Sequence, residues 1–212
     1  MALQENGSFI LSQYVAFATP LSCLCTLSAP TMSRALQKPE RFARFECLGE
    51  ATQPQFVDRV LEILEIIHQF DDFERKDIMV MLEQMTCYRV PAESPIVFED
   101  EIGDFMMLLL NGSVEVVKKD GAGIYRQLCV VEPGKVLGEM SLIDDQPRSA
   151  GCIARSEVTF AVLSRAGLND ILRNEPSTGC KILMFLLLMS TERLRNVSGR
   201  LAFLLGENLA WL

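Results

Sequence analysis

The sequence is short of residues on which many active sites depend. Its 212 residues include one His and one Trp, and 20 Lys and Arg stand against 28 Asp and Glu, a formal net charge of -8. A single histidine, His68, offers no metal-ligand set, so it is expected to be a packed or surface residue. An acidic chain without a dense basic face is a poor general binder of nucleic acid. No nucleophile–base pair or metal cluster stands out in the sequence, so an enzyme is not expected.

Seven cysteines make an odd number with irregular spacing. Four of them lie in apolar segments, where a thiol acts as a small hydrophobic group: Cys87, Cys129, Cys152 and Cys180. The pattern favours a reducing cytoplasm over a disulfide scaffold. A hydrophobic fraction of 49% with 23% charged residues describes a globular protein and excludes a disordered one.

The segment from Phe9 to Ala29 has no charged residue and is long enough to raise the question of a membrane span. Pro20 interrupts it, and the only charge before residue 30 is Glu5, whereas a secretory signal begins with positive charge. Residues 1–50 are therefore expected to be an N-terminal extension, either flexible or docked on the domain or a partner. Membrane attachment is the remaining alternative.

Residues 51–86 are expected to form helices. Pro54 fits the first turn of one helix. The apolar face of this helix consists of Phe56, Val60, Leu64 and Ile67. A second helix is expected from about Phe73 to Met85, with Asp72 as its cap.

Residues 87–164 change to short apolar runs separated by turn residues, which predicts strands. The expected strands are Tyr88–Val90, Ile96–Phe98, Phe105–Leu110, Ser113–Lys118, Ile124–Val131 and Val158–Leu163. Asn111-Gly112 predicts a tight hairpin because both residues tolerate positive φ, and Asp120–Gly123 marks the next turn. Short strands at this spacing predict an antiparallel β-roll or jelly roll.

Residues 165–212 return to a helical period, with a short helix at Leu168–Leu172 and a long one from Pro176 to about Leu205. Eight positions of the long helix alternate by three and four, as in a heptad seam: Cys180, Leu183, Leu187, Ser190, Leu194, Val197, Leu201 and Leu204. Leu183–Met189 is apolar all round, so a second copy of the helix is expected to cover the side that the roll does not. A helix packed only on its own domain is the alternative. The expected class is mainly β with flanking α.

The segment from Gly138 to Ala150 carries the most informative chemistry. Gly138 precedes a short helical turn at Glu139–Ile143, whose first N–H groups have no intrahelical partner and can hold an anion. Arg148, nine positions after Glu139, can grip two phosphate oxygens, and Ser149 adds a hydroxyl. A carboxylate at the same site favours a ligand with a hydroxyl near its phosphate, such as a ribose that carries a cyclic phosphate. The alternative is an internal Glu139–Arg148 ion pair in a domain that binds nothing.

These residues resemble the cyclic nucleotide-binding domains of the catabolite activator protein and of the regulatory subunits of cyclic-AMP-dependent kinase. The resemblance covers about Phe70 to Leu205. It rests on an ordered series of motifs: Val97-Phe98-Glu99, Gly103-Asp104-Phe105, Leu110-Asn-Gly112-Ser-Val-Glu-Val, Pro133-Gly134 and Val136-Leu137-Gly138-Glu139. Leu137 departs from it where many members carry an aromatic, and Gly151 where a β-branched residue is common.

The resemblance implies that Glu139 takes the ribose 2′-hydroxyl and that Arg148 takes the cyclic phosphate, which Ser149 also touches. It assigns main-chain contacts to Gly138, Met140, Ser141 and Ala150. The long helix would cover the base, where Asn196 or Ser198 is within reach. The expected ligand is cyclic AMP, with cyclic GMP as the alternative, and no cofactor is expected.

The resemblance further implies a bacterial, cytoplasmic sensor that signals by rearranging its helices. A homodimer through the long helix is expected, together with a downstream protein that the sequence does not identify. About eight residues follow Leu204, too few for the helix-turn-helix of related transcription factors, so direct nucleic-acid binding is not expected. The alternatives are a non-binding dimerisation or interaction module and a Crp/Fnr-like regulator that lacks its DNA-binding domain. The acidic turn of Glu99, Asp100, Glu101 and Asp104 is expected to be solvated.

Overall fold

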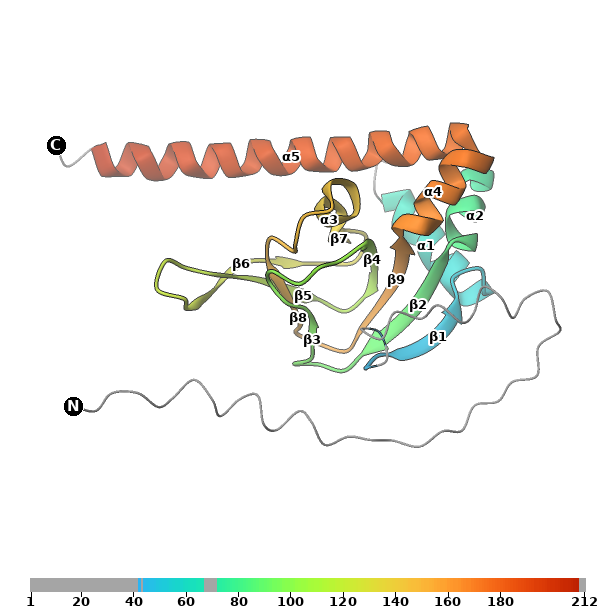
Figure 1. The fold of residues 1–212 in the computed structure, drawn as a ribbon, viewed down its shortest axis with the longest axis horizontal. Helices are drawn as coiled ribbons and strands as arrows, with labels where there is room; N and C mark the ends of the chain where they lie inside the picture. The colour runs from blue at the N-terminus through green and yellow to red at the C-terminus, as the bar shows by residue number, and fades with distance from the viewer. Residues whose placement is uncertain (1–41, 43, 67–71, 210–212) are drawn as a thin grey trace. The chain divides into compact units, whose positions relative to one another are not determined.

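Two antiparallel sheets form the roll, and helices pack against it (Figure 1). The computed structural model describes residues 42, 44–66 and 72–209, and every element discussed below belongs to the unit that begins at Arg44. The strands are β1 (Glu46–Glu50), β2 (Met85–Val90), β3 (Pro95–Val97), β4 (Phe105–Asn111), β5 (Val114–Lys119), β6 (Tyr125–Val131), β7 (Val136–Leu137), β8 (Gly151–Ala154) and β9 (Val158–Ser164). The helices are α1 (Pro54–Ile66), α2 (Arg75–Glu83), α3 (Glu139–Asp144), α4 (Arg165–Asn174) and α5 (Pro176–Leu209).

The strand orders are β1-β2-β9-β4-β7 in one sheet and β3-β8-β5-β6 in the other. The expected class, mainly β with N-terminal helices and a long C-terminal helix, is confirmed.

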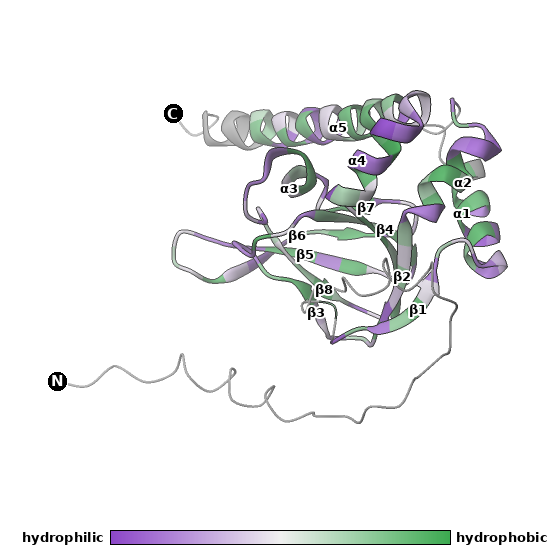
Figure 2. Ribbon diagram, turned by 45° about the vertical axis from the view of Figure 1, so that its right-hand side comes forward, coloured by the Kyte–Doolittle hydropathy of each residue, from purple (hydrophilic) through white to green (hydrophobic). Residues whose placement is uncertain are grey.

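The longest apolar runs become the central strands of the five-stranded sheet. Met106, Leu108 and Leu110 of β4 join the core that the helices share, whereas the alternate residues of the strand are buried on its opposite face. A strand covered on both faces is apolar throughout, and Figure 2 shows β4 in the colour of hydrophobic residues. Each fully buried Leu or Phe contributes roughly 1.5–3 kcal/mol, so this strand fixes the centre of the fold.

The prediction of a tight hairpin at Asn111-Gly112 is wrong. β4 pairs with β7 and β9, whereas β5 pairs with β6 and β8, so the chain changes sheet at this turn. Gly112 has the positive φ that its sequence predicts, 82°, but a Cβ at Gly112 would lie 2.2 Å from the carbonyl oxygen of Glu157. The turn therefore packs against the segment between β8 and β9, and its two strands diverge instead of pairing.

The turn expected at Asp120–Gly123 is confirmed, and it joins the paired strands β5 and β6. One carboxylate oxygen of Asp120 accepts from the main-chain N–H groups of Ala122 and Ile124, and the other accepts from Arg126 Nε. These hydrogen bonds lower the pKa of Asp120. A short polar side chain thus closes the turn, as expected for Asp in this position.

The first helix matches its apolar pattern, and the second begins later than expected. Phe56, Val60 and Leu64 are buried on one face of α1, and Ile67 lies outside the described residues. The cap of α2 is Glu74 rather than Asp72.

The buried carboxylate of Asp77 explains this later start and also connects α2 to α5. Asp77 accepts from the main-chain N–H of Glu74 at 2.9 Å, which satisfies an otherwise unpaired donor at the start of α2. It also accepts from Thr178 Oγ1 and Lys181 Nζ of α5, each at 2.6 Å. The charge of Asp77, which is fully buried, is thereby compensated.

Three short strands are not among those expected from the sequence. β1 lies within residues 1–50, where an extension is expected, and pairs with β2. The two-residue strand β7 pairs with β4, and β8 pairs with β3 and β5. The segment Phe9–Ala29 and His68 lie outside the described residues. Within the part that is described, no helix combines the length and the apolar character needed to cross a bilayer.

The cysteines that the sequence assigns to apolar surroundings divide into two pairs. Cys87 and Cys152 are buried, as expected. Cys129 and Cys180 are exposed, which corrects the expectation for them. Cys129 lies on β6, an edge strand of its sheet, and Cys180 lies on an exposed part of α5. Apolar neighbours in the sequence therefore do not ensure that a cysteine is buried.

The long helix α5 has a buried face and an exposed apolar face. Ile182, Phe185, Leu186 and Met189 pack into the core shared with the other helices and the roll. The exposed apolar side chains include the seam positions Leu183, Leu187, Leu194, Val197 and Leu201. Leu183–Met189 is therefore buried on one side only within a single chain.

Candidate functional site

A cavity of about 620 Å³ lies between the roll, α3 and the second half of α5. Of the nine residues singled out from the sequence, eight line it: Gly138, Glu139, Met140, Ser141, Arg148, Ser149, Ala150 and Asn196. Ser198 does not line the cavity and is exposed, so its expected contact with the base is not supported. The cassette and one turn of α5 are thus brought together as the sequence predicts.

Gly138 sets the direction in which α3 leaves the roll. Its φ of 78° lies in the left-handed region, which an L-residue with a side chain adopts only at a cost. A Cβ at this position would also lie 2.1 Å from Nη1 of Arg148 and 3.2 Å from the carbonyl oxygen of Phe105. Glycine is needed here both for its backbone conformation and for the close approach of Arg148.

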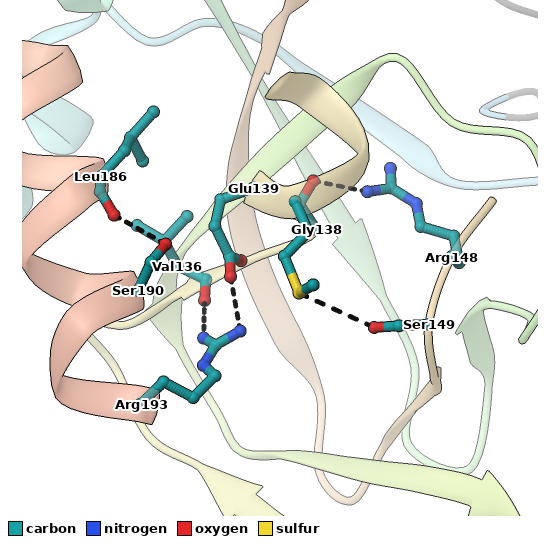
Figure 3. Close-up of polar contacts among 9 residues, drawn as sticks. Val136, Gly138, Glu139, Arg148, Ser149, Leu186, Ser190 and Arg193 are labelled. Carbon is teal, nitrogen blue, oxygen red and sulfur yellow. Dashed lines mark hydrogen bonds and ion pairs between the residues drawn. The ribbon is translucent and has the colours of Figure 1, made fainter. Parts of the chain in front are cut away.

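Glu139, the first residue of α3, carries a carboxylate of which only one oxygen is hydrogen-bonded. The residue is only 2% exposed, and its Oε1 accepts from Nη1 of Arg193 on α5 at 2.5 Å (Figure 3). Its Oε2 is buried and has no hydrogen-bond partner among the described residues. Arg193 also donates to the carbonyl oxygen of Val136 at 3.5 Å. The pair therefore leaves one buried acceptor beside the cavity.

Arg148 lines the same cavity, but its guanidinium meets the carbonyl oxygen of Gly138 and not the carboxylate of Glu139, as Figure 3 shows. Nη1 donates to the carbonyl oxygen of Gly138 at 2.7 Å and Nη2 to that of Phe105 at 2.8 Å. The guanidinium carbon lies 4.3 Å from the centroid of the Phe105 ring, a cation–π contact. Arg148 is 3% exposed. The guanidinium expected to face an anion is instead held against main-chain carbonyls, and the alternative ion pair with Glu139 is not formed.

Two main-chain hydrogen bonds hold Arg148 to the segment after β3. Its N–H donates to the carbonyl oxygen of Glu101, and its carbonyl accepts from the N–H of Asp100, each at 2.9 Å. Ser149 Oγ lies 3.9 Å from the sulfur of Met140, a weak contact that leaves the hydroxyl close to the cavity. The loop that carries Arg148 and Ser149 is thus tied to the segment after β3.

The residue that the sequence patterns do not reveal is Arg193. It follows the buried residues Ile182, Leu186 and Met189 at helical spacings of four, three and four, and Asn196 and Arg200 continue the series along the cavity. Extending the buried face of α5 by this period would have pointed to Arg193. The change from apolar to polar side chains on that face marks where α5 passes from the core to the cavity.

The cavity combines a buried acceptor with several cations, which suits an anionic ligand that also presents a hydroxyl. Arg193 and Arg200 of α5 line it together with Lys135 and Arg148. Burial raises the pKa of Cys152, which lines the wall, to about 12, so its thiol is protonated at neutral pH. Among the residues that the structure describes, no group of three or more His, Cys, Asp and Glu is arranged to hold a metal ion.

Comparison with known proteins agrees with this geometry. Residues 87–175 match the family model of the cyclic nucleotide-binding domain. The crystal structure of a cyclic nucleotide-binding domain from Methylobacillus flagellatus KT superposes with a TM-score of 0.68 and 36% identity, covering 75% of this chain and 88% of that one. The crystal structure of the Thermus thermophilus catabolite activator protein superposes with a TM-score of 0.58 and 25% identity, covering 64% of this chain and 62% of that one.

A curated relative, the cAMP-dependent protein kinase regulatory subunit of Aspergillus fumigatus, is 33% identical over 53% of this chain and 26% of its own length. The cyclic AMP receptor protein of Thermus thermophilus is 29% identical over 49% of this chain and 47% of its own length. The chain thus spans between a quarter and a half of these curated relatives. From its fold, its cassette and its likeness to the Methylobacillus domain, the chain belongs to the cyclic nucleotide-binding domain family.

Proposed function

We propose that the chain binds a cyclic mononucleotide in the cavity under α5 and signals its presence through that helix. Cyclic AMP is the first choice of ligand because relatives are named for it, and cyclic GMP is the second. In this proposal the protein is a regulator of the bacterial cytoplasm rather than an enzyme, and it acts as a dimer on a downstream protein.

The observation that carries the proposal is the open oxygen of Glu139. A buried acceptor without a partner is unfavourable by roughly 1–3 kcal/mol, and a ligand hydroxyl that donates to it removes that penalty. A ribose 2′-hydroxyl meets this need while Arg193 keeps its place on the other oxygen. Ser149 and the main chain of Gly138, Met140, Ser141 and Ala150 line the same space and are proposed to contact the sugar and the phosphate.

Capture of the cyclic phosphate is assigned to Arg148, and this requires a movement. The guanidinium leaves one or both of the carbonyl oxygens of Gly138 and Phe105 and turns to the phosphate. A charged acceptor forms a hydrogen bond roughly twice as strong as a neutral one, so the exchange is favourable once the ligand is present. The empty and occupied cassettes then differ in what holds Arg148.

The signal is proposed to travel through α5, because Arg193 joins that helix to the carboxylate that receives the ribose. A ligand shifts an equilibrium only by its differential affinity for the two arrangements. Couplings of ~1–3 kcal/mol are typical, and one hydrogen bond to a charged group is large enough to supply this. Asn196 of α5 lines the cavity and is the proposed contact for the base.

Calorimetry of the full chain with cyclic AMP, cyclic GMP and 2′-deoxy cyclic AMP tests the proposal. Cyclic AMP is expected to bind about 10–100-fold more tightly than its 2′-deoxy form, because the latter lacks the hydroxyl for Glu139. In Glu139→Gln the two ligands should come within a few fold of one another. If millimolar concentrations of either cyclic nucleotide give neither heat nor a rise in the unfolding temperature, the chain is a non-binding interaction module.

A further inference from the structure

The sequence suggests that the acidic turn after β3 is solvated, but its first carboxylate is largely buried. The side chain of Glu99 is only 9% exposed. Its Oε1 accepts from Lys118 Nζ at 3.1 Å and its Oε2 from the main-chain N–H of Lys119 at 2.9 Å. These bonds, that from the Lys119 N–H foremost, lower the pKa of Glu99, so the carboxylate is charged at neutral pH.

Lys118 connects this turn to the cassette. Its Nζ donates to Glu99 and also to the main-chain carbonyl oxygen of Ser149, at 2.5 Å. The ammonium therefore bridges β5, the turn after β3 and the loop that carries Arg148. The carboxylate of Glu99 fixes the ammonium, and the ammonium fixes the direction of the Ser149 carbonyl.

We infer that Lys118, held by Glu99, is a positioning residue that sets the phosphate-binding loop at Arg148 and Ser149. The inference rests on the proposed function, since it concerns how the loop meets a bound phosphate. Two main-chain bonds already hold Arg148 against Asp100 and Glu101. Lys118 adds a side-chain contact to the next residue of the loop, at the carbonyl oxygen of Ser149. Without it, the carbonyl oxygen of Ser149 loses the contact that ties it to Glu99 in the turn after β3.

The chain offers a matched control in the neighbouring residue. Lys119 has the same charge, but its Nζ lies over the ring of Tyr125, 5.4 Å from the centroid. Its contact with Glu99 is made by the main-chain N–H, which survives a change of side chain. Lys118→Met and Lys119→Met therefore remove the same charge from adjacent positions, and only the first releases Ser149.

Glu99→Gln separates positioning from long-range charge. Loss of a negative charge near the cassette strengthens phosphate binding if electrostatic attraction alone matters. If Glu99 holds Lys118 in place, the same change weakens binding, as Lys118→Met does. The two mechanisms thus predict opposite changes in ligand affinity for Glu99→Gln.

The experiment is a titration of the full-length wild type and the three variants with cyclic AMP and with the two diastereomers of its phosphorothioate analogue. Lys118→Met and Glu99→Gln are expected to weaken cyclic AMP binding about tenfold and to reduce the ratio of the two diastereomer affinities, while Lys119→Met stays within twofold of wild type. A purely structural weakening would lower both diastereomer affinities equally. Equal loss in both lysine variants, or tighter binding by Glu99→Gln, overturns the inference.

Amide hydrogen exchange in the ligand-free protein distinguishes this inference from the proposed function. Release of Ser149 is expected to speed exchange at the N–H groups of Asp100 and Arg148 in Lys118→Met but not in Lys119→Met. If the wild type binds no cyclic nucleotide, the proposed function fails and the role toward phosphate fails with it, whereas faster exchange would still identify Lys118 as the support of the loop. If Lys118→Met changes neither the exchange rates nor the affinity for cyclic AMP, the positioning role of Lys118 is rejected and the proposed function is not.

Discussion

Glu139 at the start of α3 and Arg193 in α5 form an ion pair across 54 positions of sequence. The pair joins the helix that follows the roll to the one carboxylate that the proposal assigns to the ribose. Glu139 is 2% exposed, whereas the side chain of Arg193 is 46% exposed. The guanidinium of Arg193 gives this buried carboxylate the one hydrogen bond that it receives from the described residues.

Arg193→Met leaves the carboxylate of Glu139 buried without its cation, which is costly. We expect a lower unfolding temperature and about tenfold weaker binding of cyclic AMP. Arg200→Met is the matched control, because Arg200 lines the cavity about two turns further along the same face of α5 and has no ion pair among the described residues. Thermal unfolding and calorimetry check both variants. Equal effects in the two would show that α5 contributes only general positive charge.

Arg148→Ala is expected to weaken cyclic AMP binding about a hundredfold, taking ~3 kcal/mol for the lost charge-assisted bonds. It also leaves the carbonyl oxygens of Gly138 and Phe105 without their donor, so the free energy of unfolding should fall by roughly 2–4 kcal/mol. Arg148→Lys keeps one charged donor, so it should restore part of the stability but little of the affinity, since an ammonium lacks the fork geometry. Wild-type affinity in Arg148→Ala would remove the phosphate assignment.

Gly138→Ala tests the close approach beneath α3. Gly123 has nearly the same φ, 79° against 78°, but a Cβ there meets nothing within 4 Å. Gly123→Ala should therefore lose only ~1–2 kcal/mol for the left-handed backbone. Gly138→Ala should lose clearly more, because its Cβ displaces the guanidinium of Arg148. Denaturant unfolding of the pair measures the difference, and equal losses would show that Arg148 moves aside freely.

The exposed seam of α5 predicts a dimer. Leu194 and Leu201 are 66% and 55% exposed, and a second copy of the helix would bury them. Changing both to Asp places charges in that seam and should give a monomer by sedimentation. Because both side chains are exposed in one chain, its unfolding temperature at low concentration should not fall. A wild type that is already monomeric contradicts the seam.

Asp77 predicts a specific acid sensitivity. Burial alone would raise its pKa, but hydrogen bonds from Lys181, Thr178 and the N–H of Glu74 outweigh it and lower the pKa from 3.8 to about 2. A pKa depressed by folding contributes stability that is complete above pH ~4 and is lost as the pH falls through about 2. The contribution is about 2 kcal/mol, at 1.36 per unit.

The difference in unfolding free energy between wild type and Asp77→Asn should therefore shrink as the pH falls from 4 to 2. Lys76→Met is the control: both side chains of its ion pair with Glu74 are exposed, so the pair is screened by solvent and should contribute little to stability at any pH. A pH-independent gap for Asp77→Asn would mean that the lost contacts, and not the charge, carry the effect.

Local signals in the sequence predict local structure well. Pro54, Asp120 and the apolar run of β4 each act within a few residues, and each appears where expected. The cassette was also predictable, because its residues are close in sequence and eight of the nine site predictions line one cavity.

The features that escaped prediction depend on contacts between distant segments. Gly112 has the φ of a hairpin turn, but which strands pair is decided by the sheets on either side. The direction of Arg148 depends on carbonyl oxygens 10 and 43 positions away. The helical period of α5 places Arg193 on its buried face, but only the packing of α5 over α3 brings it to Glu139, 54 positions away. Local spacing does not contain these long-range contacts, since they follow from the packing of the whole domain.

Arg193 and Leu194 are neighbours on α5, so their side chains project about 100° apart around its axis. Arg193 lines the cavity, whereas Leu194 does not and is exposed. Any rotation of α5 about its axis that moves Arg193 therefore moves Leu194 through the same angle. If α5 rotates as a rigid body, the cavity and the exposed seam cannot change independently. A small rotation of α5 where Arg193 meets Glu139 would then displace every seam residue sideways.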